Sequence, residues 1–196
     1  MKIQKIQLNK KARVIIDGRE YNFQVENFKA FNWQEGQDLE KEELDACLKK
    51  EEIFLIRLHL IKALKRRDLS SFEAYDLLKA RFGEEELINL VIEEFQKKNL
   101  INDQNYLEEY LFKGLTKFRG LKRLRYELEN KGFSMETIET LIDQDHKIYE
   151  HEQALKFTHK LLAQGFNHQK ILNRLSYAGY DEDLIEEILS KVAILY

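Results

Sequence analysis

The sequence predicts a mainly α-helical protein, with three tandem three-helix repeats in an elongated array and a small N-terminal β-hairpin. Three observations support this fold class. The 196 residues include no proline and only 8 glycines, and 43% are hydrophobic, so the composition favours helices with a packed core. One Asp-Gly pair lies between two β-prone runs near the start. A pattern typical of helix–turn–helix units then recurs at intervals of about 50 residues.

The N-terminal segment, residues 1–37, is predicted to form the hairpin. Its two β-prone runs, 12–16 and 21–25, are joined through Asp17-Gly18. Asp-Gly favours a type I′ turn, because both central residues of that turn need positive φ. This turn pairs Val14 with Tyr21 and Ala12 with Phe23. Residues 2–8 are a candidate third strand.

Helices are expected over nearly everything after Asp38. Asp38 is a plausible N-cap, and acidic residues suit a first helical turn, here Glu40, Glu42 and Glu43. The expected division of the chain is a first repeat with a leading helix at 38–101, a second repeat at 102–149 and a third at 150–196.

The repeats are recognised by a shared pattern around each turn. A leucine, expected to be buried, precedes an aromatic residue, and the two lie at Leu77/Phe82, Leu128/Phe133 and Leu175/Tyr180. The aromatic residues are 51 and 47 positions apart. Gly132 and Gly179 are natural C′ residues, and Ser134 and Asp181 natural N-caps. An apolar pair follows each turn, at Leu87/Leu90, Ile138/Leu141 and Ile185/Ile188. Stacking of such units buries their apolar faces.

The segment 111–131 is the most basic part of the chain. It holds seven basic and two acidic residues, a charge of +5, although the whole chain carries −3. On a helix starting near Arg119, the leucines share one face, and the candidate binding residues lie on the other side or close by: Arg119, Lys122, Arg123 and Tyr126, with Lys117 and Arg125. These side chains suit a phosphate backbone or an acidic protein surface. The alternative is a solvated helix face, with Tyr126 packed against a neighbouring repeat.

Several functional classes are disfavoured by composition. A pI near 6.0 argues against a protein whose main function is to bind DNA. The single cysteine, Cys47, and five scattered histidines give no disulfide, metal site or catalytic constellation. The N-terminus lacks a signal-peptide pattern, and no window of about 20 apolar residues could span a bilayer. We therefore expect a cytoplasmic, non-enzymatic protein without cofactors or membrane contact.

Four segments, spread over nearly the whole chain, are similar to the RecX family. The central one, Arg119-Gly120-x-x-Arg123-Leu124-x-x-Glu127-Leu128-x-x-Lys131-Gly132-Phe133, resembles the central motif of RecX proteins. The other three are Leu100-Ile101-Asn102-Asp103-x-x-Tyr106, Ser70-x-x-Glu73-Ala74-x-x-Leu77, and the hairpin followed by Glu35-Gly36-x-x-Leu39. Their order and spacing together make the resemblance specific.

The resemblance implies three tandem three-helix repeats and a monomeric regulator that lies in the deep groove of the RecA filament on single-stranded DNA. It also implies damping of RecA's ATP hydrolysis and strand exchange. Many family members are basic, whereas this chain is not, so we expect weak or indirect nucleic-acid contact. Leu107 also departs from the family, which usually has a small residue there. Two alternatives remain: a helical-repeat adaptor for another protein, and a direct nucleic-acid binder using residues 119–131.

Overall fold

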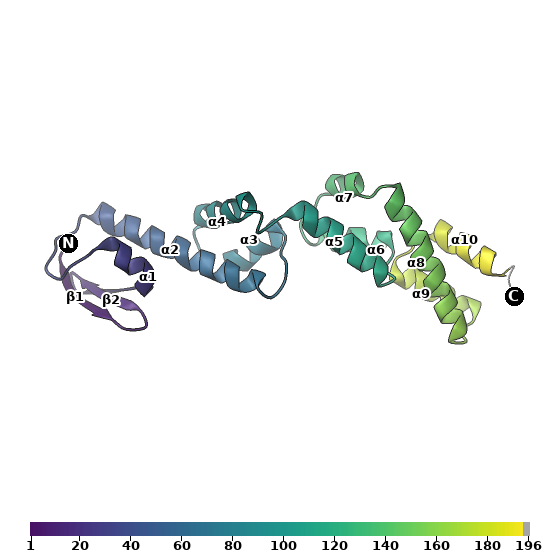
Figure 1. The fold of residues 1–196 in the computed structure, drawn as a ribbon, viewed down its shortest axis with the longest axis horizontal. Helices are drawn as coiled ribbons and strands as arrows, with labels where there is room; N and C mark the ends of the chain where they lie inside the picture. The colour runs from purple at the N-terminus through teal and green to yellow at the C-terminus, as the bar shows by residue number, and fades with distance from the viewer. Residues whose placement is uncertain (194–196) are drawn as a thin grey trace. The chain divides into compact units, whose positions relative to one another are not determined.

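The computed structural model describes residues 1–193 and is mainly helical, as predicted (Figure 1). The chain divides into two compact units. The first comprises residues 1–68 and 74–100, and the second comprises 69–73 together with the chain from Ile101 onward. The division passes through helix α3 (Ser71–Lys79). Among residues 1–193, no helix has the length and apolar character needed to cross a membrane.

The first unit begins with a three-stranded antiparallel sheet in the order β1 (Ile3–Leu8), β2 (Ala12–Ile16) and β3 (Arg19–Phe23). Asp17 and Gly18 have φ of 44° and 78°, as the predicted turn requires. The predicted pairing of Val14 with Tyr21 and of Ala12 with Phe23 is confirmed. The expected hairpin is therefore two strands of a larger sheet, because β1 pairs with β2.

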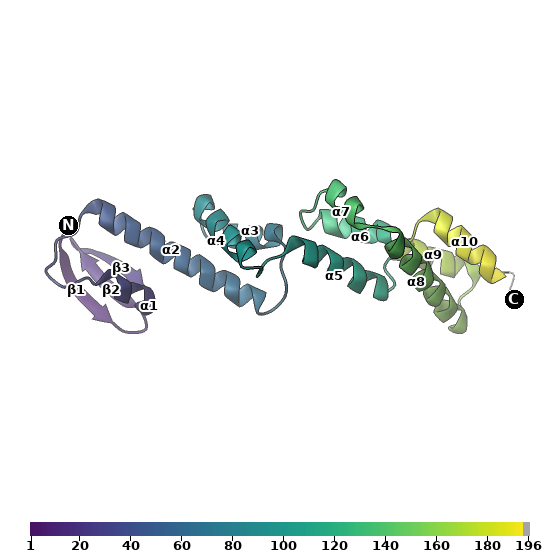
Figure 2. The same cartoon turned by 45° about the horizontal axis from the view of Figure 1, so that its top comes forward.

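One face of the sheet is covered by α1 (Val25–Phe28), the short 3-10 helix η1 (Lys29–Phe31) and the start of α2 (Lys41–Leu64) (Figure 2). Aromatic rings fill this interface, with centroids 5.1 to 6.1 Å apart among Phe23, Phe28, Phe31 and Trp33. Farther along the chain, α2 packs against α4 (Glu85–Lys97), and Arg57 forms a 2.6 Å ion pair with Glu94. A lone sheet would be marginal, so these helices stabilise it.

The start of α2 differs from the prediction. The helix begins at Lys41 with Glu40 as the N-cap, rather than with Asp38. Asp38 instead forms an isolated antiparallel bridge with Lys2. Extended pairing to the N-terminal strand therefore keeps Asp38 out of the helix, a long-range effect that cap propensity alone does not reveal.

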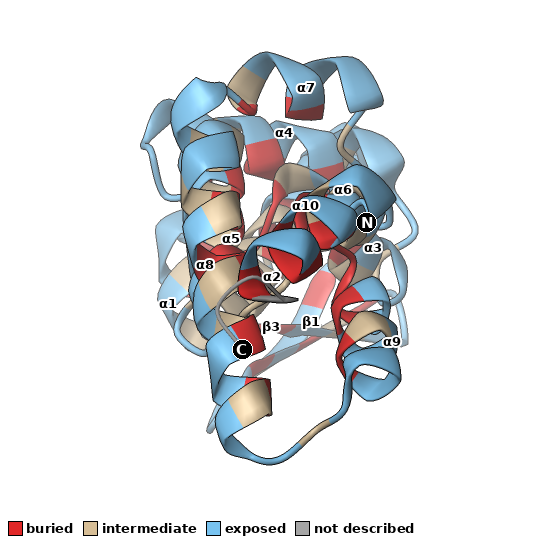
Figure 3. Cartoon of the chain, turned by 90° about the vertical axis from the view of Figure 1, so that its right-hand side faces the viewer, coloured by how far each residue is buried: buried red, intermediate tan, exposed pale blue. Residues whose placement is uncertain are grey.

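Up to residue 193, the second unit contains six further helices in two packed groups. The first group is α5 (Asp103–Thr116), α6 (Leu121–Glu129) and α7 (Met135–Leu141); the second is α8 (Gln144–Ala163), α9 (His168–Ala178) and α10 (Glu182–Ala193). Each group has its own apolar cluster, and the buried parts of α8, α9 and α10 face one another (Figure 3). The boundary expected between residues 149 and 150 lies within α8, whose N-cap is Asp143.

The repeat pattern holds, but the predicted alignment of the first repeat is one residue out. Leu128 and Leu175 are fully buried as expected, whereas Leu77 is only half-buried and its neighbour Leu78 takes the buried place. Likewise Ile88 and Val91 are buried in place of Leu87 and Leu90. With Leu78 aligned, the buried leucine and the first buried isoleucine of each repeat are ten residues apart: Leu78/Ile88, Leu128/Ile138 and Leu175/Ile185.

The shift has a cause in the helix ends. Phe133 and Tyr180 each donate a backbone hydrogen bond to a carbonyl five residues earlier, beyond Gly132 and Gly179, which have φ of 87° and 88°. Such glycine-containing ends match the Schellman motif. Phe82 follows no glycine and donates to Leu78, four residues earlier. The first repeat therefore reaches its aromatic residue one position sooner.

Candidate functional site

Helix α6 carries most of the candidate binding residues, and its orientation agrees with the prediction. Leu121, Leu124 and Leu128 are buried in the α5–α7 cluster. On the opposite side Lys122 is exposed, and Tyr126 exposes 67% of its surface. The tyrosine is therefore not buried against a neighbouring repeat, which was the alternative considered from the sequence. Lys117, at the C-cap of α5, is exposed as well.

Arg119 and Arg123, two of the candidate binding residues, are both ion-paired with one carboxylate. Glu127 accepts from Arg119 Nη1 and from Arg123 Nε, both at 2.7 Å. The hydroxyl of Tyr110 also donates to Glu127 at 2.8 Å. The i,i+4 spacing of Arg123 and Glu127 offered a sequence signal for one of these pairs. The other two contacts join residues whose proximity depends on the packing of α5 against α6.

The groups around Glu127 keep its carboxyl group ionised. Partial burial opposes ionisation of the carboxyl, but the hydrogen bonds from Arg123, Tyr110 and Arg119 outweigh burial, so the pKa of Glu127 is lowered. The carboxylate is therefore charged at neutral pH and holds both arginines in place. Arg125, the remaining candidate, is paired with Glu139 at 2.5 Å.

Helix α9 adds residues that the sequence analysis did not identify. The backbone N–H of Gly120 donates to the Ala178 carbonyl at 2.9 Å, which fixes the start of α6 against the end of α9. The Arg123 guanidinium lies 5.9 Å from the ring centroid of Tyr177, which is 80% exposed. Arg174 and Lys170 are also exposed and lie one and two turns before Tyr177 on the same helix face.

The exposed and half-buried residues on the outer sides of the two helices form one basic and aromatic surface, here called the α6–α9 surface. Its members are Lys122, Arg123, Tyr126, Lys170, Arg174 and Tyr177. The 170, 174, 177 spacing on α9 was visible in the sequence. Its adjacency to α6 was not, because the Gly120–Ala178 contact joins residues 58 positions apart.

Lys131, the last residue of the basic segment 111–131, makes contacts that stabilise the fold. Its ammonium forms a 2.9 Å ion pair with Glu73 and lies over the rings of Tyr106 and Tyr110, at 5.6 and 5.1 Å. Its backbone carbonyl accepts from the Ser70 hydroxyl at 3.2 Å. These contacts tie residues 69–73 to the rest of the second unit.

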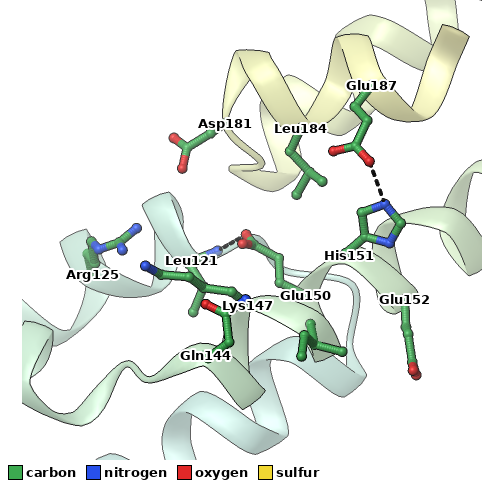
Figure 4. Close-up of a pocket in the computed structure, with 11 residues that line it drawn as sticks. Leu121, Arg125, Gln144, Lys147, Glu150, His151, Glu152, Asp181, Leu184 and Glu187 are labelled. Carbon is green, nitrogen blue, oxygen red and sulfur yellow. Dashed lines mark hydrogen bonds and ion pairs between the residues drawn. The ribbon is translucent and has the colours of Figure 1, made fainter.

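A pocket lies between α6, α8 and α10, lined by Arg125, Lys147 and Asp181 among others (Figure 4). Glu150 is only 6% exposed there and accepts a 2.6 Å hydrogen bond from the Leu121 N–H, so it caps the start of α6. Burial raises the pKa of Glu150 above its ordinary value. The hydrogen bond from the Leu121 N–H lowers that pKa, the negative charge of Asp181 raises it, and the positive charge of Arg125 lowers it, but burial is the largest of these effects. Within residues 1–193, no group of three His, Cys, Asp or Glu side chains could hold a metal ion.

The raised pKa of Glu150 predicts a specific effect of pH on stability. Below about pH 4.3, the ordinary value, both folded and unfolded states are protonated, and the group makes no difference. As pH rises further, the unfolded state ionises more readily, so the wild-type chain loses stability up to the folded pKa. A glutamine side chain at this position could still accept the hydrogen bond from the Leu121 N–H, without carrying a charge.

We therefore expect Glu150→Gln to exceed the wild type in free energy of unfolding at pH 7, and the two to converge near pH 4. Urea unfolding followed by circular dichroism at both pH values measures this. Glu152→Gln, an exposed carboxyl on α8, is the control. A stability difference that is the same at both pH values would contradict the assignment to Glu150 ionisation.

Known proteins are similar to most of this chain. No family model matches. The regulatory protein RecX of Clostridioides difficile is 27% identical over 169 residues, covering 83% of this chain and 79% of that protein. The regulatory protein RecX of Caldanaerobacter subterraneus is 26% identical over 195 residues, covering 96% and 97%. The chain is therefore similar to RecX regulatory proteins over nearly its whole length.

Crystal structures agree on the fold. A regulatory protein RecX superposes with a TM-score of 0.70 over 96% of this chain and 98% of that one, at 19% identity. RecX from Lactobacillus salivarius gives 0.64 over 73% of this chain and 97% of that one, at 21% identity.

The RecX-like central motif is explained mainly by folding contacts. Arg119, Arg123 and Glu127 form the ion-paired cluster, and Leu124 and Leu128 are core. Gly120 and Gly132 lie at close contacts with other backbone or side-chain atoms, and Phe133 stacks on Tyr106 at 5.9 Å. Two of the positions between motif residues, Lys122 and Tyr126, are the ones left exposed. The motif thus builds the helix, and the intervening positions Lys122 and Tyr126 leave their side chains exposed.

Proposed function

We propose that this RecX-like chain binds the RecA filament on single-stranded DNA and inhibits RecA's ATP hydrolysis and strand exchange. Similarity to RecX proteins supports the regulatory role, since those relatives are named regulatory proteins. The observation that carries the binding proposal is the α6–α9 surface, which has four cations and two exposed tyrosines in a chain whose net charge is −3.

The chemistry of this surface suits a composite partner. Basic side chains attract phosphates and acidic protein surfaces, and exposed aromatic rings offer flat area for stacking or for apolar contact. Arg123 is held by Glu127, so its position is already fixed before binding, which lowers the entropy lost on association. The negative charge of the rest of the chain opposes tight binding to DNA alone. A filament of RecA on DNA offers both phosphates and a protein surface, so the chain can bind it without binding tightly to DNA alone.

In this proposal the chain works as a monomer in the cytoplasm, by binding rather than by catalysis, and without a cofactor. Its effect on RecA arises because a molecule attached along the filament opposes the changes that accompany ATP turnover and strand exchange.

The test is RecA's DNA-dependent ATPase rate with the wild-type chain and with Lys122→Glu combined with Tyr126→Ala. Both side chains are exposed and lie outside the Glu127 cluster, so the double variant should melt like the wild type. We expect it to need at least about tenfold more protein for half-maximal inhibition, equivalent to about 1.4 kcal/mol of binding free energy.

The matched control is Lys97→Glu combined with Leu100→Ala, which reverses one charge and truncates one exposed apolar side chain in the first unit. The control should inhibit like the wild type. Full inhibition by the α6 double variant at matched salt would contradict the binding role of this surface. A wild-type chain that leaves RecA's ATPase rate unchanged would instead favour an adaptor for another protein.

A further inference from the structure

A second basic region lies in the N-terminal sheet, far along the sequence from the α6–α9 surface. Residues 1–23 contain six basic side chains, Lys2, Lys5, Lys10, Lys11, Arg13 and Arg19, and two acidic ones, Asp17 and Glu20. Their charge is +4 in a chain of net charge −3, so residues 24–196 carry −7. This concentration of charge needs an explanation, since the fold of a sheet does not require it.

The strand pattern sends Arg13 to the uncovered face of the sheet. Ala12, Val14 and Ile16 of β2 are buried in the core with Phe23, so the alternate residue Arg13 points the other way. Its paired neighbours on that face are Gln7 of β1 and Asn22 of β3. The β1–β2 turn then adds Asn9, Lys10 and Lys11, all exposed.

These residues form a shallow hollow lined by Asn9, Lys10, Lys11, Arg13 and Asn22. The lining has three cations and two amides and no carboxylate. Glu20 lies beside it, forms a 3.1 Å ion pair with Arg13 Nε and accepts a 3.1 Å hydrogen bond from the Asn22 amide. Through these contacts Glu20 orients both side chains next to the turn lysines. The aromatic core beneath the sheet holds the strands that carry them.

We propose that this hollow binds the phosphodiester backbone of single-stranded nucleic acid, as a site separate from the α6–α9 surface. Lysine, arginine and asparagine are among the side chains that contact phosphate oxygens in nucleic-acid complexes. No aromatic side chain lines the hollow, so it lacks a platform for base stacking and its binding is independent of base sequence. The Arg13 Nη groups and the Asn9 amide supply directed donors beside the groups paired with Glu20, which favours a phosphate over a diffuse acidic surface.

The test is binding of the full-length chain, without RecA, to a fluorescent 20-nucleotide thymidine strand at several low salt concentrations. The variant is Lys10→Gln, Lys11→Gln and Arg13→Gln together. The control neutralises three exposed lysines of α2, with Lys41→Gln, Lys49→Gln and Lys62→Gln. Both variants lose the same charge, so only the position of the charge differs between them.

We expect the hollow variant to bind at least about tenfold more weakly than the control. Its slope of log affinity against log salt should fall by about 2, since each neutralised phosphate contact on a single strand contributes about 0.7. Equal affinity and slope in the two variants would overturn the proposal. So would stronger wild-type binding to an oligoglutamate of the same charge, which would assign the hollow to an acidic protein.

This test does not depend on RecA, and its failure leaves the proposed regulation of RecA untouched. The Lys122→Glu, Tyr126→Ala chain serves as a further arm. If it abolishes binding to the strand while the hollow variant keeps it, nucleic acid is held by the α6–α9 surface alone and the second site is rejected.

Discussion

Gly120→Ala is expected to lower the free energy of unfolding of the second unit by about 3 kcal/mol, at the upper end of the usual cost of overpacking. A Cβ at Gly120 would lie 2.1 Å from the Gly179 carbonyl oxygen and 2.4 Å from the Tyr180 nitrogen. Both are backbone atoms, so no side-chain rotation can relieve the clash. The start of α6 and the end of α9 must separate, and the Gly120–Ala178 hydrogen bond is lost.

Gly83→Ala is the matched control, because Gly83 has no positive φ and a Cβ there would meet nothing within 4 Å. Urea unfolding of both variants, followed by circular dichroism, measures the difference. The separation of α6 from α9 should also move Tyr177 away from Arg123, so Gly120→Ala should inhibit RecA less well than Gly83→Ala. A stability for Gly120→Ala within about 0.5 kcal/mol of the control would show that the two helix ends do not meet as described.

Leu128→Ala is the second change expected to have a large effect, a loss of about 2–5 kcal/mol in the free energy of unfolding. Leu128 is completely buried in the α5–α7 cluster, and its truncation leaves a cavity among the surrounding leucines. An unchanged melting temperature for this variant would mean that the repeat pattern has no common core position.

The first repeat provides a sharper comparison. Leu78→Ala should cost as much as Leu128→Ala, because both side chains are completely buried. Leu77→Ala should cost clearly less, since Leu77 is only half-buried. A larger loss at Leu77 than at Leu78 would restore the alignment expected from the sequence and contradict the structural one.

Local rules succeeded where one short segment decides the structure. The Asp17-Gly18 turn fixed the pairing of β2 with β3, because its two positive φ angles leave one register. Gly132 and Gly179 correctly marked helix ends, and Ser134 caps α7 as expected. The leucine spacing correctly identified the buried face of α6. In each case the relevant interactions lie within a few residues.

The sequence by itself determined the helical class, the N-terminal strands and the repeated turns, because hydrophobic periodicity and turn chemistry depend on neighbouring residues. It also determined the resemblance to RecX, because the order of the motifs can be read directly along the chain. Tertiary structure alone decided which basic side chains are available to a partner. Arg119 is held by Glu127, and Tyr177 lies beside Arg123, through the packing of α5 against α6 and of α6 against α9. Ion pairing and adjacency between helices depend on distances across space, which a helical pattern in the sequence does not specify.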